Sequence, residues 1–198
     1  MHDIKSIVDK IFAVFESHKD EEHIEMELRL GKHNGTFFDT NVGKENFERV
    51  LEGLRKYNAW EKTETTESDV YYSDNNNIRL SVKKDTGDDG VMVQKINVLK
   101  EDFTGTPTDM RFSISREIPT WGEYEMDRVR TKTRHSFVRK NLTIDMTISS
   151  GDNADMDSEE PCSYQIEFEI VKPQDVTCRD EFFNIIHKLN DLSKLIPV

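Results

Sequence analysis

The sequence is poor in the features that mark a secreted or a membrane-spanning protein. It has two cysteines, Cys162 and Cys178, in 198 residues, which is too few for a disulfide framework. No apolar run reaches membrane-spanning length, and no long apolar run follows a basic start at the N-terminus. We therefore expect free thiols and an intracellular protein that is not secreted and does not bind a membrane.

Positive charge is scarce as well. The chain has 27 Lys and Arg residues against 39 Asp and Glu residues, so its net charge is −12. A surface that binds duplex DNA is usually basic, and this balance argues against one. The composition is still compatible with a small basic pocket inside an acidic shell.

The chain also lacks two common signatures of enzymes that handle phosphates or metals. It has no G-x-x-x-x-G-K-[ST] sequence, which would form a phosphate-binding loop before a helix. Its six histidines are scattered without the spacing of metal ligands. A P-loop mechanism is therefore unsupported.

What the sequence does have is two kinds of hydrophobic periodicity. Apolar residues recur at helical spacing in 4–15, 44–57 and 179–196, and the stripe of the second stretch runs from Phe47 to Tyr57. The period is two in seven stretches: 23–31, 78–83, 91–100, 110–118, 128–138, 141–149 and 164–171. An antiparallel sheet of this length normally curls towards a barrel, so we expect one mainly β, α+β domain over residues 1–198. The acidic segment 151–161 has neither period and is expected to be a solvated loop.

The polar faces of the predicted strands are sorted by charge. The first strand has Glu25 and Glu27 on its polar face, and the last strand has Glu167 and Glu169. The cations lie on strands between these two, at Arg79, Arg111, Arg128, Arg130, Lys132 and Arg134. If these faces converge on a common interior, the barrel has a charged lumen, and its apolar faces point outward, where the helices can cover them.

Such a lumen has a specific chemistry. Closely packed carboxylates repel one another and need a counter-charge, and their hard oxygen atoms suit Mg²⁺ or Mn²⁺. Opposing Arg and Lys side chains bind an anion with several phosphates, and Arg offers bidentate geometry. A lone E-x-E pair in a strand is usually a solvated face. Two pairs with cationic strands between them favour a site for phosphoryl transfer.

These residues resemble a known family. The sequence E-x-E-x-R-L-G in the first strand, E-x-E in the last, and R-x-K-x-R between them resemble the triphosphate tunnel metalloenzymes. More narrowly, they resemble the metal-dependent RNA 5′-triphosphatases of fungal, protozoal and large DNA virus mRNA capping. Arg29 followed by Gly31 favours this capping branch, because the branch of thiamine triphosphatases and class IV adenylate cyclases usually has Lys in the place of Arg29. The sequences "RFSISRE" and "RTKTRHSF" favour it too.

The resemblance implies a closed eight-stranded antiparallel β-barrel, or triphosphate tunnel, with helices packed outside. It implies that the ligands of Mg²⁺ or Mn²⁺ are Glu25, Glu27, Glu167 and Glu169. The residues that it implies for binding the triphosphate are Arg79, Lys95, Arg111, Arg130, Lys132 and Arg134. The catalytic residues that it implies are Glu117, which acts on the attacking water, and Arg130, Lys132 and Arg134; Asp145 and Arg29 support them.

Two assignments are open. A one-residue slip in the strand that carries Lys95 would favour Lys100 as the lumen residue. Fungal relatives often have a third Glu where this chain has Gln165, and an amide supplies no charge to a metal, so we expect a structural or secondary role there.

The implied reaction removes the γ-phosphate from 5′-triphosphate RNA in the first step of mRNA cap formation, with NTP hydrolysis in Mn²⁺ as a second activity. The implied partners are the 5′-triphosphate end of RNA, NTP, and an RNA guanylyltransferase in cis or in trans. The chain has no K-x-D-G guanylyltransferase motif of its own, and is therefore either free-standing or the N-terminal domain of a larger capping enzyme. The alternatives are a general tripolyphosphatase or nucleoside triphosphatase, and a non-catalytic barrel that binds polyphosphate.

Overall fold

A computed structural model describes residues 4–87, 89–104, 108–152 and 162–196. It contains three α-helices, which are α1 (Ile4–His18), α2 (Lys44–Lys56) and α3 (Arg179–Ser193). The strands are β1 (Ile24–His33), β2 (Phe38–Asp39), β3 (Lys62–Ser73), β4 (Ile78–Lys83), β5 (Val91–Phe103), β6 (Asp109–Pro119), β7 (Arg128–Arg139), β8 (Leu142–Gly151) and β9 (Cys162–Ile170). No helix in the described ranges is both long and apolar enough to cross a membrane.

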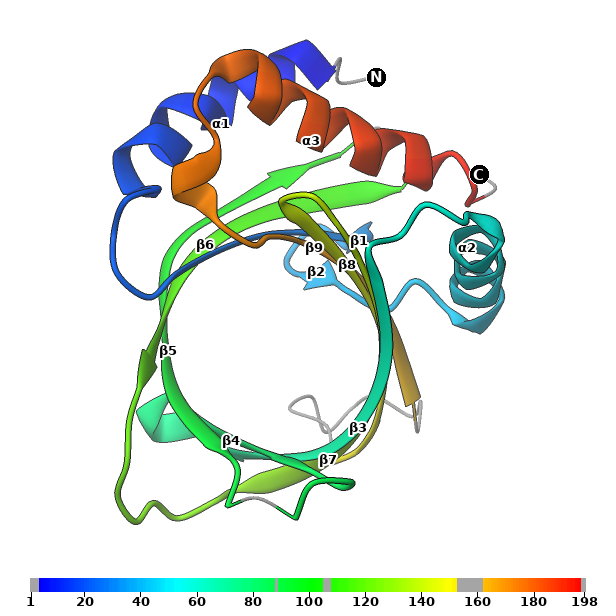
Figure 1. The fold of residues 1–198 in the computed structure, drawn as a ribbon. Helices are drawn as coiled ribbons and strands as arrows, with labels where there is room; N and C mark the ends of the chain where they lie inside the picture. Colours follow the sequence, from blue (N-terminus) through cyan, green and yellow to red (C-terminus); the bar gives the residue numbers. More distant parts are fainter. Residues whose placement is uncertain (1–3, 88, 105–107, 153–161, 197–198) are drawn as a thin grey trace.

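Eight of the strands close into a barrel (Figure 1). Their order is β1-β6-β5-β4-β3-β7-β8-β9, and β9 pairs with β1 to complete the circle. Every pairing is antiparallel, and the two-residue β2 is added to the far end of β1. The prediction of a closed eight-stranded antiparallel barrel is confirmed.

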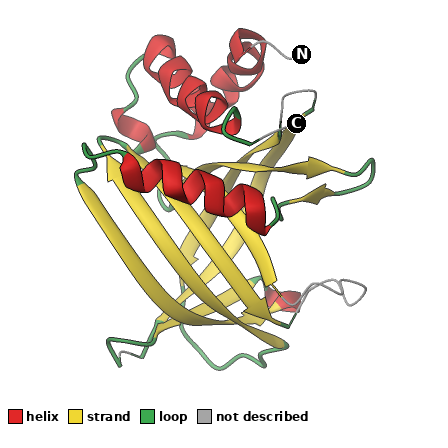
Figure 2. Cartoon of the chain, turned by 90° about the vertical axis from the view of Figure 1, so that its right-hand side faces the viewer, coloured by secondary structure: helices red, strands yellow, loops and turns green. Residues whose placement is uncertain are grey.

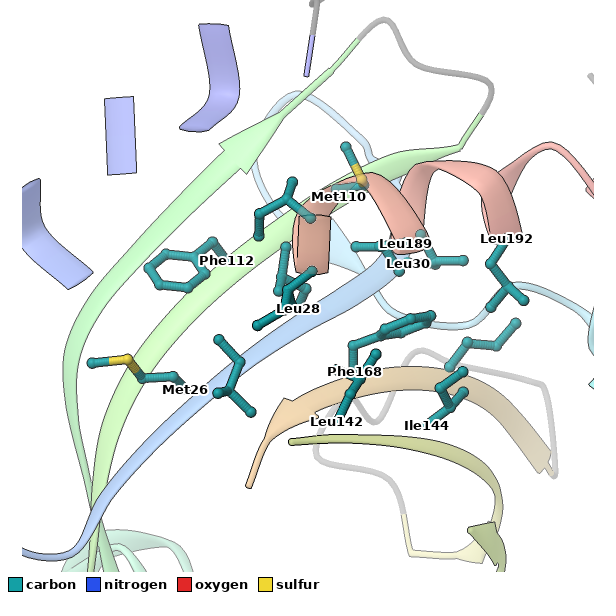
Figure 3. Packing of buried hydrophobic residues seen from close by; sticks show 14 of the residues in the cluster. Met26, Leu28, Leu30, Met110, Phe112, Leu142, Ile144, Phe168, Leu189 and Leu192 are labelled. Carbon is teal, nitrogen blue, oxygen red and sulfur yellow. The ribbon is translucent and has the colours of Figure 1, made fainter. Parts of the chain in front are cut away.

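The hydrophobic core lies outside the barrel, between its wall and the helices. Met26, Leu28 and Leu30 alternate along β1 and are fully buried on its outer face (Figure 3). The core includes Phe182 of α3, whose ring centroid lies 4.4 Å from that of Phe15 in α1. Alternation along each strand therefore places the polar residues in the lumen, as the sequence predicts.

The helices cover only part of the barrel. All three lie towards one side of it, while the end of β3, β4 and the start of β7 form the opposite wall (Figures 1 and 2). On the uncovered wall the outward-facing Ile96 of β5 and Val129 of β7 are 41% and 37% exposed. The expectation that helices cover the outward apolar faces is therefore right for one half of the barrel and wrong for the other.

Other expectations about the elements need correction. β3 was not predicted, because its first half is polar on both faces and shows no apolar alternation. Helix α2 ends at Lys56, and Tyr57 is 40% exposed and packs edge-on against Trp60, so it does not belong to the apolar stripe. The predicted acidic loop, 151–161, lies mostly outside the described residues; 151 is the last residue of β8.

Candidate active site in the barrel

The barrel encloses a polar cavity of about 510 Å³. Its walls come from β1 and β3 to β9, because alternate residues of each of these strands face inward. Every residue of the predicted site lines this cavity: Glu25, Glu27, Arg29, Arg79, Lys95, Arg111, Glu117, Arg130, Lys132, Arg134, Asp145, Glu167 and Glu169. Residues from both ends of the sequence therefore meet in one chamber.

The acidic wall is formed where β1 and β9 pair. Glu27 lies opposite Glu169 in the register, and Arg29 lies opposite Glu167. The Nη2 atom of Arg29 donates to Oε2 of Glu27 at 3.2 Å and lies 3.0 Å from Oε1 of Glu167. Arg29 therefore holds the first and last strands together through their carboxylates.

The carboxyl groups of this wall have shifted pKa values. Burial raises the pKa of Glu169 to about 7, and the neighbouring carboxylates of Glu25 and Asp145 add to the effect. Burial also raises the pKa of Glu27. Burial acts in the same sense on Glu167, but the cations of Arg29 and Arg134 outweigh it and lower its pKa to about 2. The acidic wall thus repels itself most strongly around Glu169.

A lysine lies among these carboxylates. The ammonium of Lys95 binds Glu25 and lies 3.2 Å from Oε1 of Glu117 and 3.9 Å from Oε1 of Glu27. In the part of the chain that the structure describes, no three His, Cys, Asp or Glu side chains already converge as a metal-binding group. The donors are all carboxylate oxygens under mutual repulsion, which suits a hard divalent cation. Such a site would form only as side chains rearrange around Lys95.

The basic wall is the inward face of β7. Arg134 lies 3.1 Å from Oδ2 of Asp145, and Arg130 donates from Nε to Oγ of Ser149 at 2.7 Å. Lys132 has no carboxylate within ion-pair distance among the described residues, and burial lowers the pKa of its ammonium. Lys132 is thus less neutralised by carboxylates than Arg134 is.

The predicted water-orienting residue, Glu117, lies on β6 at the same chamber. It accepts from Nη2 of Arg79 at 2.5 Å. Burial raises its pKa, but the cations of Arg79 and Lys95 outweigh this and lower the pKa below its ordinary value. Glu117 is therefore ionised at neutral pH and can accept a hydrogen bond from water.

The question between Lys95 and Lys100 has an unexpected answer, because both line the cavity. Two residues five apart face opposite sides of a regular strand. The pairing of β5 with β6 shifts between Asn97 and Leu99, so a β-bulge brings both lysines to the same face. The sequence between the lysines has no glycine or other clear signal for this bulge.

Tyr72 and Arg128 are among the cavity residues that were not assigned from the sequence. Tyr72 was missed because β3 was missed, and the guanidinium of Arg128 lies 3.9 Å from the centre of its ring. Arg128 appeared in the predicted cationic row but received no role. The uncertain Gln165 lines the cavity and donates from Nε2 to Oγ1 of Thr40 at 3.2 Å, which ties β9 to the segment after β2.

Comparison with known proteins agrees with this architecture. RNA triphosphatase Pct1 of S. pombe is similar over 98% of this chain and 92% of its own, with a TM-score of 0.75 and 17% identity. Pct1 in complex with the Spt5 CTD gives the same TM-score at 18% identity over 98% of this chain and 93% of its own. The Mimivirus capping enzyme triphosphatase is similar over 97% of this chain and 100% of its own, with a TM-score of 0.67 and 16% identity.

Comparison with curated protein sequences gives no significant match. The model of one protein family, described as "mRNA capping enzyme, beta chain", matches residues 33–196. This match spans most of the chain and includes the strands that carry the basic wall and the last E-x-E pair. The chain therefore belongs to the mRNA capping enzyme beta-chain family, the family of the mRNA triphosphatases.

Proposed function

We propose that this RNA 5′-triphosphatase of mRNA capping hydrolyses the γ-phosphate of 5′-triphosphate RNA inside the barrel, with a divalent metal ion held at the acidic wall. The observation that carries the proposal is the division of one closed cavity into an acidic wall on β1 and β9 and a basic row on β7. A polyphosphate between these walls meets cations on one side and metal-binding oxygens on the other.

The residues that would hold the metal are Glu25, Glu27 and Glu169, with Glu167 next to them. When bound, Mg²⁺ or Mn²⁺ supplies positive charge that neutralises phosphate oxygens. The raised pKa of Glu169 supports this assignment, because a divalent ion relieves the repulsion from Glu25 and Asp145 that helps to raise it.

The remaining steps belong to the chain itself. Arg130, Lys132 and Arg134 bind the phosphate oxygens on which charge increases as the terminal phosphoryl group leaves. The ionised Glu117 accepts a hydrogen bond from the attacking water and aligns it with the γ-phosphorus. The diphosphate end that remains is the chemical substrate for guanylyl transfer, so we propose an RNA guanylyltransferase, in cis or in trans, as the next enzyme. Because the proposed substrate is newly made RNA, we also propose an intracellular location.

The test is phosphate release from γ-labelled triphosphate RNA, with EDTA, Mg²⁺ or Mn²⁺ present. We expect no turnover in EDTA and recovery with either metal. Glu25→Ala, Glu27→Ala and Glu169→Ala should each abolish turnover and leave the circular dichroism spectrum unchanged. Glu67→Ala is the control, because Glu67 is an exposed carboxylate of β3 outside the cavity. Full turnover in EDTA would refute the metal mechanism.

A second candidate is a general tripolyphosphatase or nucleoside triphosphatase. This candidate is favoured by the charged groups of the cavity, because they can bind phosphates but do not recognise a base. The ratio of kcat/KM for triphosphate RNA to that for tripolyphosphate and ATP separates the two activities. Binding of all three without turnover would instead indicate a non-catalytic barrel.

A further inference from the structure

A second cavity, of about 410 Å³, opens from the lumen beside the hairpin between β4 and β5. It shares Arg79, Lys132 and Arg134 with the first cavity, so the two spaces meet at these cations. Register pairs place its other residues on the lumen face, because Ser68 of β3 lies opposite both Lys83 of β4 and Lys132 of β7. Apart from these three cations, no residue of the predicted site lines this space.

The lining of the second cavity differs from that of the first. It has hydroxyl groups from Thr66, Ser68 and Ser81, the cation of Lys83, and no Asp or Glu among its described residues. Lys83 is exposed at the end of β4 and forms no ion pair with a described carboxylate. Val91, at the start of β5, is 65% exposed and offers an apolar surface at the same place.

Two guanidinium groups towards the opposite end of the barrel are already neutralised. Arg128 binds both carboxylate oxygens of Asp74, at 2.8 and 2.9 Å. Arg111 binds both of Asp102, at 2.6 and 2.8 Å. A phosphodiester arriving at that end would have to compete with a carboxylate for each guanidinium. At the β4–β5 end it would meet the ammonium of Lys83, which has no ion pair with a carboxylate of the described residues.

We propose that the second cavity binds the first nucleotides of the RNA chain while its triphosphate lies at the basic row, an inference that rests on the proposed function. In this arrangement Lys83 pairs with the phosphodiester that follows the first nucleoside, and Val91 contacts a base. The serine and threonine hydroxyls supply hydrogen bonds without repelling the backbone. The cavity thus distinguishes triphosphate RNA from tripolyphosphate and ATP, which have no phosphodiester.

The experiment compares Lys83→Ala and Lys84→Ala with the wild-type enzyme on tripolyphosphate, ATP and a ten-nucleotide triphosphate RNA. Lys84 is the matched control, because it is the next residue, has the same charge, and lies 3.3 Å from Oδ1 of Asp69 on the outer face. We expect Lys83→Ala to lower the ratio of kcat/KM for RNA to that for tripolyphosphate by about two- to fivefold, because KM for RNA rises. This is the effect expected from the loss of one exposed ion pair. Lys83→Glu should lower the ratio further.

Salt dependence gives a second readout. Each contact to a phosphate of a single strand contributes about 0.7 to the slope of log affinity against log salt. Lys83→Ala should therefore reduce this slope for RNA by about 0.7, and Lys84→Ala should keep the wild-type slope.

The outcomes separate this inference from the function on which it rests. An active enzyme in which Lys83→Ala keeps the wild-type RNA ratio and salt slope overturns the inference alone, as does an equal loss on RNA and tripolyphosphate. A wild-type enzyme that releases no phosphate from triphosphate RNA in either metal overturns the proposed function and the inference together.

Discussion

Glu167 and Glu169 are two residues apart on the same face of β9, yet their carboxyl groups have opposite pKa shifts. Burial disfavours the charged form of both. Around Glu167 the cations of Arg29 and Arg134 outweigh burial, whereas around Glu169 the carboxylates of Glu25 and Asp145 reinforce it. One E-x-E pair thus contains one permanently ionised carboxylate and one that titrates near neutrality.

The titration of Glu169 makes the stability of the metal-free protein depend on pH. Its pKa is about 7 in the folded chain against an ordinary value of 4.5, so its contribution to stability is fully present below about pH 4.5 and is lost as the pH rises through 7. Glu169→Gln removes this loss. We expect the variant to be more stable than the wild type at pH 8, by at most about 3 kcal/mol, and to lose the advantage at pH 4.5.

Urea unfolding in EDTA at several pH values measures this difference. Glu67→Gln on the exposed face of β3 serves as the control and should show no pH-dependent gain. A constant difference between Glu169→Gln and the wild type from pH 4.5 to 8 would contradict the assignment.

The cations of β7 should differ in kinetic effect. A side chain that meets developing charge acts mainly on kcat, whereas one that holds the rest of the substrate acts mainly on KM. Lys132 has no ion-pair partner among the described residues, so we expect Lys132→Ala to lower kcat by about 10²–10³-fold. Arg134→Lys should recover only part of the activity lost in Arg134→Ala, because an ammonium cannot form a bidentate contact.

Steady-state kinetics on triphosphate RNA measures both effects. Thr133→Ala is a suitable control, because Thr133 lies on the same strand and faces outward, opposite Glu67 of β3. Near-wild-type kinetics for Lys132→Ala and Arg134→Ala would mean that the basic row does not touch the substrate.

At the scale of elements, the predictable strands are those with an apolar outer face. In β8, Leu142, Ile144 and Met146 alternate with polar residues, and these three apolar side chains are buried in the hydrophobic core. β3 has no such signal in its first half, because five of its first six residues are exposed to water. This half is held by backbone pairing with β7, and only Ser68–Ser73 pairs with β4 as well; residue type does not reveal this pairing.

The site was predictable for the same reason. The parity of each strand fixes the face on which a charged residue lies, so each predicted site residue reaches the lumen once the strand is correct. The alternation of faces no longer holds across a β-bulge, as between Lys95 and Lys100. It also gives no information about a residue whose strand was not predicted, as for Tyr72 in β3. Ion pairing also depends on packing, so the neutralisation of Arg128 by Asp74 could not be foreseen.

The helical layer supports the β6 wall through one aromatic side chain. Phe182 of α3 is fully buried and lies 4.4 Å from Phe15 and 6.3 Å from Phe112, measured between ring centroids. Phe182→Ala should lower the free energy of unfolding by about 3–5 kcal/mol, because it leaves a cavity between helix and barrel. The neighbouring Phe183 is only partly buried, and Phe183→Ala should cost clearly less. Urea unfolding decides, and equal costs would contradict this packing.

At the scale of the whole molecule, the lumen stores electrostatic repulsion that a bound ion would release. A ligand that binds only the folded state stabilises it by about 2.7 kcal/mol at one hundred times its Kd. We expect Mn²⁺ to raise the Tm at pH 8 and to do so less at pH 6, where Glu169 is mostly protonated. The double variant Glu25→Ala, Glu27→Ala should lose the Mn²⁺ effect. A Tm shift of the same size in this variant would place the ion elsewhere.

The one-sided helical cover has a consequence for the motions of the barrel. All eight strands are paired on both sides, but only the half beneath the helices also rests on a packed apolar layer. Backbone amides exchange with deuterium through local openings, and an opening costs less where few apolar contacts break. The amides of β1, β8 and β9 should therefore exchange most slowly. Those of Ser68–Ser73 in β3 and of Ile78–Ser81 in β4 should exchange faster, although these segments are also paired on both sides. Local opening of the barrel would thus be most frequent in the wall that faces away from the helices, next to Lys83 and Lys132.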